Sequence, residues 1–172
     1  MVRLLLLRHF DRDLADASQA SPLLPVGQQR AAKLAEELAG SSAHLLCSPF
    51  RRCLQSVRHL PGELVVDDSF SEYPVEHSLD QALARRHVEE LDMTVRDWHW
   101  RRGAVPGETL DELEQRCRLG LQTHLMRLAD TDGLVVLCSH QTTLQHLSTL
   151  LGCPHEFEQM GDSLRLDVHS FV

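Results

Sequence analysis

The stretch LLLLRHF at residues 4–10 holds the clearest indication of the fold. It belongs to a short and, apart from Arg3, apolar run, Val2–Leu7, that ends directly in Arg8 and His9. Such a run is typical of a strand that is buried on both faces, as in a parallel sheet. Ligands of open α/β sheets bind beyond the carboxyl ends of the strands, so this strand is expected to deliver Arg8 and His9 to a binding site.

Further segments are interpreted as strands of the same sheet. His44–Cys47 and Leu134–Cys138 are similar apolar runs, and Leu64–Val66 is a shorter candidate. Apolar and polar residues alternate strictly over Ser163–His169, which predicts a half-exposed edge strand. Helical patterns separate most of these segments, and strands that alternate with helices predict an α/β fold with a largely parallel sheet.

Helix signals fill the intervals between the predicted strands. The clearest is Thr109, followed three residues later by Glu112, because this pair forms a capping box at the start of a helix. Gly40 and Gly152 mark two helix ends. The predicted helices cover Val26–Ala39, Arg51–Leu60, Thr109–Ala129 and Gln141–Leu151, with a weaker one over Leu79–Leu91.

Length and charge limit the functions that this chain can have. Its 172 residues fit a single domain, residues 1–172. The 17 Lys and Arg against 25 Asp and Glu give a net charge of −8, which disfavours binding to nucleic acid or to an anionic membrane surface. Five Cys without a C-x-x-C pair favour free thiols in a reducing compartment. Because no apolar run is long enough to span a bilayer, we expect a cytoplasmic protein.

Three predicted strand ends carry residues suited to holding a phosphoryl group. Arg8 and His9 end the first strand, Arg52 lies shortly after the second, and His140 follows the strand at Leu134–Cys138. Arginine binds phosphate oxygens through paired N–H donors, and the helix that begins after His140 adds free N–H groups. No close His and Cys pair has the spacing of metal ligands, so the sequence predicts a site without a metal or cofactor.

Four segments resemble, in order and spacing, the signature segments of the histidine phosphatase superfamily, the phosphoglycerate-mutase-like group with an Arg-His-Gly motif. They are LLLLRHF, CSPFRRCLQSV, PGETLDELEQR and VVLCSHQTTL, and SPLLPVGQQRAAKLAEEL resembles the family's segment between its first two motifs. The resemblance covers residues 2–151. It implies a phosphoglycerate-mutase-like fold, a three-layer α/β sandwich whose mostly parallel central sheet carries helices on both faces.

The resemblance also implies roles for the four residues at the strand ends. His9 would be the nucleophile that takes the phosphoryl group as a phosphohistidine. Arg8 and Arg52 would bind the phosphate oxygens, and His140 would complete the pocket and stabilise charge. These roles agree with the chemistry, since a neutral imidazole is a nucleophile and fixed cations stabilise the charge on a transferring phosphoryl group.

Other residues are assigned on the same resemblance. The general acid would be Glu72, with Glu76 as the alternative, because a carboxylic acid protonates the leaving oxygen and later accepts a proton from water. Glu108 would help to organise the pocket. Gln141 stands where a Gly often follows the second His, and its side-chain amide is expected to reach the substrate.

Two departures from the family pattern bear on activity. Phe10 stands where the motif has Gly, and its ring is a candidate wall of the pocket, while Ala15 stands where the family often has Asn. We predict a metal-independent phosphatase that acts on a small phosphorylated substrate or a phosphoprotein, phosphohistidine included. A non-catalytic phospho-ligand-binding protein on the same scaffold is the alternative. A phosphoglycerate mutase is disfavoured because the mutases of this family are longer.

Overall fold

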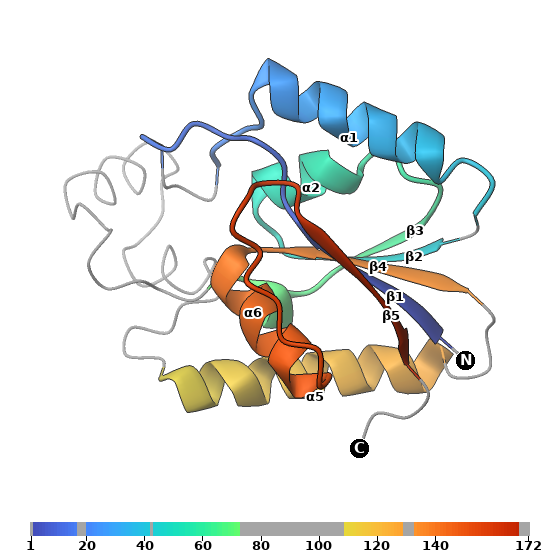
Figure 1. Ribbon diagram of the computed structural model, residues 1–172, viewed down its shortest axis with the longest axis vertical. Coiled ribbons are helices and arrows are strands. Elements are labelled where there is room, and N and C mark those ends of the chain that lie inside the picture. The colour runs from blue at the N-terminus through green and yellow to red at the C-terminus, as the bar shows by residue number, and fades with distance from the viewer. Residues whose placement is uncertain (1, 17–19, 42, 73–108, 129–132, 169–172) are drawn as a thin grey trace.

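The computed structural model describes residues 2–16, 20–41, 43–72, 109–128 and 133–168 of the chain. Its described strands form one sheet in the order β3-β2-β4-β1-β5 (Figure 1). The strands are β1 (Val2–Arg8), β2 (Ala43–Cys47), β3 (Gly62–Val66), β4 (Leu134–Ser139) and β5 (Ser163–Val168). All neighbouring pairs are parallel except β1 and β5. This arrangement confirms the mostly parallel sheet and the edge position of the half-exposed strand β5, and it shows that β5 runs antiparallel to β1.

Helices cover both faces of this sheet, which makes the predicted three-layer sandwich (Figure 1). The helices are α1 (Pro25–Glu37), α2 (Arg51–Val57), α5 (Leu110–Leu128) and α6 (Gln141–Leu150), and a 3-10 turn, η1, covers Asp68–Phe70. α1 and α2 pack on one face and α5 and α6 on the other. β1, which contains most of the stretch LLLLRHF, therefore has helices on both of its faces, as expected for a strand that is buried on both sides.

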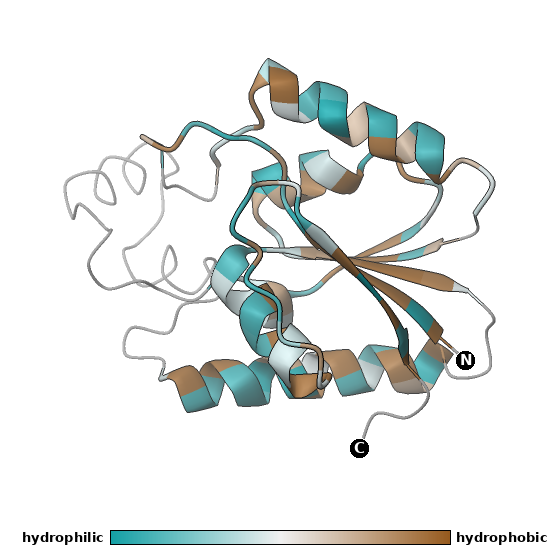
Figure 2. Cartoon of the chain, viewed as in Figure 1, coloured by the Kyte–Doolittle hydropathy of each residue, from teal (hydrophilic) through white to brown (hydrophobic). Residues whose placement is uncertain are grey.

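The apolar run of β1 contributes to two separate hydrophobic cores. Leu5 and Leu7 pack with residues of α1 and α2, whereas Leu4 and Leu6 pack with residues of α5 and α6. This follows from the geometry of a strand, in which successive side chains point to opposite faces. Figure 2 shows the sheet as the most hydrophobic part of the molecule. Burial on both faces explains why the sequence of β1 has no polar alternation.

Helix boundaries agree with the predictions in most places. The capping box before α5 is present, with the Thr109 N–H 2.7 Å from Glu112 Oε2 and the Glu112 N–H 3.2 Å from Thr109 Oγ1. α2 ends at Val57 and not at the predicted Leu60. Pro61 disfavours helical geometry at Leu60, the residue before it, so the helix cannot extend to its predicted end. The predicted helix Leu79–Leu91 lies outside the described residues.

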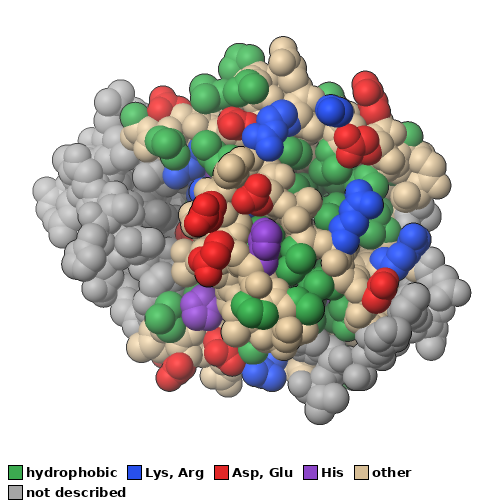
Figure 3. All heavy atoms as spheres, viewed as in Figure 1, with side chains coloured by type: hydrophobic (Ala, Val, Ile, Leu, Met, Phe, Trp, Pro, Cys, Tyr) green, Lys and Arg blue, Asp and Glu red, His purple; other side chains and the backbone are tan. Residues whose placement is uncertain are grey.

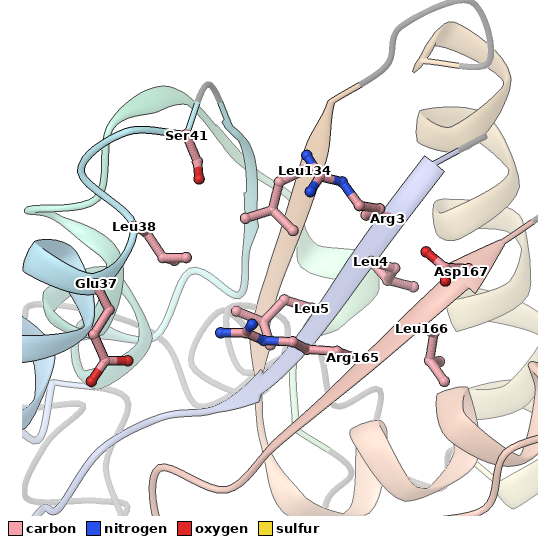
Figure 4. Close-up of a pocket in the computed structure, with 10 residues that line it drawn as sticks. All are labelled: Arg3, Leu4, Leu5, Glu37, Leu38, Ser41, Leu134, Arg165, Leu166 and Asp167. Atoms are coloured by element: carbon pink, nitrogen blue, oxygen red, sulfur yellow. The ribbon is translucent and has the colours of Figure 1, made fainter.

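The end of the sheet away from His9 and His140 contains a cavity of about 400 Å³ (Figure 4). It lies where β1 and β4 begin and β5 ends, and its lining residues include Arg3, Leu134 and Arg165. In Figure 3, acidic side chains gather near the centre of one face of the molecule, in keeping with the negative net charge. Within the described ranges, no helix combines the length and the apolar character needed to cross a bilayer.

Candidate active site

Two parallel neighbouring strands place His9 and His140 side by side. β1 and β4 are paired so that Arg8 lies opposite Ser139, and each histidine directly follows the last residue of its strand. The His9 N–H donates to the carbonyl oxygen of Ser139 at 3.0 Å, which extends this pairing. The two imidazole centroids are 5.3 Å apart, and both side chains are buried. Residues 131 positions apart in the sequence therefore lie in contact at one edge of the sheet.

The hydrogen bond of His9 defines the state of its imidazole ring. Nδ1 lies 2.9 Å from the carbonyl oxygen of Phe10, and a carbonyl oxygen only accepts, so Nδ1 carries the proton. Burial lowers the pKa of His9 well below its ordinary value, and the charge of Arg52 lowers it further. The ring is therefore neutral at pH 7, with a lone pair on Nε2.

His140 is held on both sides of its ring. Its Nδ1 is 3.2 Å from Nη2 of Arg52, and since arginine only donates, Nδ1 accepts. Nε2 then carries the proton and donates to Ser48 Oγ at 2.8 Å. Burial lowers the pKa of His140 well below its ordinary value, followed by the charge of Arg52. The neutral His140 ring orients the Arg52 guanidinium.

Arg52 is a buried cation on the first turn of α2. Its side chain is only 3% exposed and lies 4.6 Å from the centre of the Phe50 ring. Burial lowers the pKa of Arg52 to about 10, so the guanidinium is still charged at neutral pH. Ser56 Oγ donates to the Arg52 carbonyl oxygen at 2.8 Å and accepts from the Phe10 N–H at 3.1 Å. This hydroxyl fixes α2 against the loop that follows β1.

Arg8 is held by the segment that precedes β5. Its Nη1 donates to the carbonyl oxygens of Phe157 and Glu158, at 2.7 and 2.6 Å. Phe157 has a positive φ of 49°, a left-handed conformation that costs a residue with a Cβ about 1–2 kcal/mol. Its ring is fully buried in the hydrophobic core, which offsets this cost. The Nε of Arg8 is itself buried and makes no hydrogen bond within the described part of the chain.

Glu72 reaches the same site from η1. The segment before it is tied to the end of β4 and the start of α6, because Ser139 Oγ donates to the Phe70 carbonyl at 2.5 Å and Thr143 Oγ1 donates to the Ser71 carbonyl at 2.8 Å. Thr143 Oγ1 also lies 3.5 Å from Glu72 Oε1.

The charge of Glu72 raises the pKa of Arg8, of Arg12 and of Arg52, against the effect of burial, which lowers all three. The Glu72 carboxylate therefore lies near three guanidinium groups. Gln141, the first residue of α6, is half-buried next to His140. Glu76 and Glu108 lie outside the described residues.

Phe10 does not line the pocket. Its ring is 4% exposed and packs in the hydrophobic core with residues of α1 and α2. Gly161, at a φ of +82°, makes room for it, since a Cβ on Gly161 would lie 2.6 Å from the Phe10 ring. The Gly161 N–H also donates to the His9 carbonyl oxygen at 3.0 Å. The loop before β5 thus accommodates a large side chain at the position of the motif Gly.

Two residues at the site were not among the sequence predictions. Ser48 accepts the hydrogen bond of His140, and its signal in the sequence was its position directly after the predicted strand His44–Cys47. Arg12 lies three residues after His9, and its charge lowers the pKa of His9 and of His140, in addition to the larger effect of burial. Within the described ranges, no group of three or more His, Cys, Asp and Glu side chains is arranged to hold a metal ion.

The fold and the site together define an α/β protein with buried His and Arg side chains at the carboxyl edge of a mostly parallel sheet. The sequence profile of the histidine phosphatase superfamily (branch 1) matches residues 4–167, and the chain belongs to this family. The resemblance seen in the four sequence segments is confirmed. Membership of this family supports phosphatase activity in general. No match is found among curated proteins.

Solved structures share the fold at low sequence identity. A mutant phosphoserine phosphatase from Entamoeba histolytica, in complex with phosphoserine, has a TM-score of 0.64 at 16% identity, over 98% of this chain and 92% of that one. The protein histidine phosphatase SixA, complexed with tungstate, has a TM-score of 0.62 at 18% identity, over 96% and 88%. A mycobacterial glucosyl-3-phosphoglycerate phosphatase, complexed with VO3, has a TM-score of 0.63 at 21% identity, over 97% and 93%.

Proposed function

We propose that this protein is a metal-independent phosphatase that hydrolyses a phosphate monoester or a phosphohistidine through a phosphohistidine intermediate on His9. The observation that carries the proposal is the hydrogen bond between His9 Nδ1 and the Phe10 carbonyl oxygen. It leaves the lone pair of a neutral ring on Nε2, the state that a nucleophile requires. Arg52 and His140 lie beside this ring, which suits the binding of a phosphoryl group.

In the first step, His9 Nε2 attacks phosphorus, and the bond from phosphorus to the leaving oxygen breaks, or, in a phosphohistidine substrate, the bond from phosphorus to the leaving ring nitrogen. Charge is spread over the three other phosphoryl oxygens, and the guanidinium groups of Arg8 and Arg52 stabilise it. Glu72, protonated at this point, gives its proton to the leaving oxygen or ring nitrogen. The products of this step are the free alcohol, or the free imidazole of a phosphohistidine substrate, and phospho-His9.

In the second step, water attacks phosphorus and the bond between phosphorus and Nε2 breaks. The Glu72 carboxylate accepts a proton from the attacking water, which restores its acid form. His9 returns to its neutral state and inorganic phosphate leaves. His140 acts by orienting Arg52, and the side-chain amide of Gln141, which directly follows His140 and is half-buried, contacts the substrate in this proposal.

The experiment that tests this function traps the intermediate. The protein is mixed with labelled phosphoesters and with phosphohistidine peptide, then quenched in alkali, where phosphohistidine is stable, or in acid, where it is lost. Wild-type protein is expected to carry an acid-labile adduct, and His9→Ala none. His59→Ala, which removes an exposed histidine, is the matched control and keeps the adduct.

A non-catalytic phosphate binder is distinguished by the same experiment. It would bind orthovanadate or phosphate but release no product from any substrate of the panel. Ala15, which is exposed and carries no hydrogen-bond donor in its side chain, is the feature that favours this alternative. Phe10 no longer favours it, because its ring lies in the core and its carbonyl oxygen still orients His9. Full activity of His9→Ala would overturn the proposed mechanism.

A further inference from the structure

Arg12 is fixed in place by the turn that follows His9. Its backbone forms a β-bridge with Leu23, and its Nη1 donates to the carbonyl oxygens of Asp13 and Asp16, at 2.8 and 2.7 Å. The Ala15 N–H donates to Asp13 Oδ1 at 2.9 Å, which stabilises the turn itself. Holding a long side chain by two hydrogen bonds reduces the entropy that it loses on binding a ligand.

The edge of the Arg12 guanidinium that carries Nε is buried. Its Nε is buried and makes no hydrogen bond within the described part of the chain, and the same is true of the Nε of Arg8. A buried N–H without a partner costs about 1–3 kcal/mol, so such groups call for an explanation. The buried Nε–H groups of Arg8 and Arg12 are both explained if each donates to an anion bound at this site.

The charge of Arg12 acts on the same groups as that of Arg52. After the larger effect of burial, it lowers the pKa of His9 and of His140, in both cases more than Arg8 does. It also lowers the pKa of Arg52. For Arg12 itself, burial lowers the pKa, while Asp16 and Glu72 raise it. Arg12 therefore belongs electrostatically to the pocket and not to the exterior.

We propose that Arg12 is a third phosphoryl-binding arginine, whose Nε–H donates to a phosphoryl oxygen of the substrate alongside Arg8 and Arg52. The inference rests on the proposed function for what enters the site, and it does not require turnover. Phosphoryl transfer spreads negative charge over three oxygens, and guanidinium groups are suited to all of them. Three guanidiniums around one imidazole repel one another, and a dianion between them removes this repulsion.

The test measures the binding of orthovanadate, a phosphate mimic, by titration calorimetry at pH 7.5. Arg12→Gln is expected to weaken binding by about tenfold or more, since it removes a charged donor. Arg165→Gln is the matched control, because Arg165 lines the cavity at the far end of the sheet (Figure 4), and it should bind as wild type. Affinity of Arg12→Gln within twofold of wild type overturns the proposal.

A second variant keeps the test decisive if Arg12→Gln does not fold. Arg12→Lys retains the charge and the aliphatic stem but has no Nε–H donor. A loss of more than about threefold supports the proposal, and an unchanged affinity overturns it. The outcome is independent of the proposed function, because a wild-type protein that binds vanadate but cleaves no phosphoester would refute the catalytic mechanism and leave the assignment of Arg12 intact.

Discussion

Arg52 Nη2 donates to His140 Nδ1 at 3.2 Å, and both side chains are buried. One consequence is that the opposite ring nitrogen of His140 must donate, and Ser48 is its acceptor. By accepting a hydrogen bond from His140, the Ser48 hydroxyl therefore fixes the orientation of Arg52 on α2. Each part of this chain of contacts has a measurable effect.

Replacing Ser48 by Ala is expected to destabilise the protein and to weaken anion binding. The variant removes the hydroxyl acceptor of the buried His140 Nε2–H and leaves it only the weak acceptor Cys53 Sγ at 3.5 Å, which costs about 1–3 kcal/mol in the free energy of unfolding. Denaturant unfolding followed by circular dichroism measures this. Ser163→Ala, on the exposed face of β5, is the control and should change the free energy of unfolding by less than about 0.5 kcal/mol. A Ser48→Ala variant as stable as this control would contradict the assigned His140 tautomer.

The acid limb of the pH profile of kcat/KM reports the protonation of free His9, separately from the limb that the general acid sets. Burial, followed by the charge of Arg52, lowers the pKa of His9, so the ring stays neutral at pH values where an exposed histidine is already half protonated. After correction for the second ionisation of the substrate phosphate near pH 6, the acid limb of kcat/KM is expected to lie at lower pH than the limb of an exposed histidine, whose pKa is about 6.5. A corrected profile that falls with an apparent pKa near 6.5 would place His9 in an exposed environment and count against the structure.

The same two histidines make stability depend on pH. The pKa of His9 and that of His140 are lowered by burial and then by Arg52, so the unfolded chain binds protons below about pH 6.5 that the folded protein does not. The free energy of unfolding must then decrease as pH falls below this value, by up to about 1.4 kcal/mol per pH unit for each histidine. Their contribution is fully present above pH 6.5.

Unfolding midpoints between pH 7.5 and 5 measure this slope. His9→Gln/His140→Gln is expected to flatten it, and His59→Gln, at an exposed position, is expected to leave it unchanged. The comparison is between slopes, so a uniform loss of stability in the double variant does not disturb it. If the slope of the double variant equals that of wild type, the protons are taken up elsewhere and the two rings are not buried in neutral form.

Gly161 provides a test of how the site tolerates Phe10. Gly161→Ala is expected to destabilise the protein strongly for two reasons. A side chain at a φ of +82° is strained, and the new Cβ would lie only 2.6 Å from the Phe10 ring. Gly152→Ala is the control for strain alone, since Gly152 has a φ of +74° and a Cβ there would meet no atom within 4 Å, and it should cost about 1–2 kcal/mol. Adding Phe10→Ala to Gly161→Ala should recover part of the difference. Equal losses in the two glycine variants would show that Phe10 does not pack there.

Much of the site could be predicted from the residues that follow the buried strands in the sequence. A buried apolar run predicts a parallel strand, and parallel neighbours bring their carboxyl ends together, so Arg8, His9 and His140 could be placed at one edge from the sequence. The position of Arg12 could not, because it depends on a turn that is closed by hydrogen bonds to Asp13 and Asp16. Residue spacing carries no signal for which way such a side chain turns.

The surroundings of Phe10 were equally out of reach of sequence patterns. Whether its ring faces the pocket or the core depends on Gly161, which lies 151 positions further along the chain. The contact of Ser48 with His140 also joins distant segments, and it exists only because β2 and β4 are neighbours in the sheet. Long-range pairing of this kind is decided by tertiary packing.

The central claim is that Nε2 of His9 takes the phosphoryl group, and the position of the phosphate on the ring tests it most directly. Base hydrolysis of the trapped protein, followed by separation of the two phosphohistidine isomers, identifies the nitrogen. The hydrogen bond from Nδ1 to the Phe10 carbonyl oxygen predicts the Nε2 isomer alone, located at His9 by peptide mapping. Phosphate on Nδ1, on another residue, or on no residue during turnover would contradict the account.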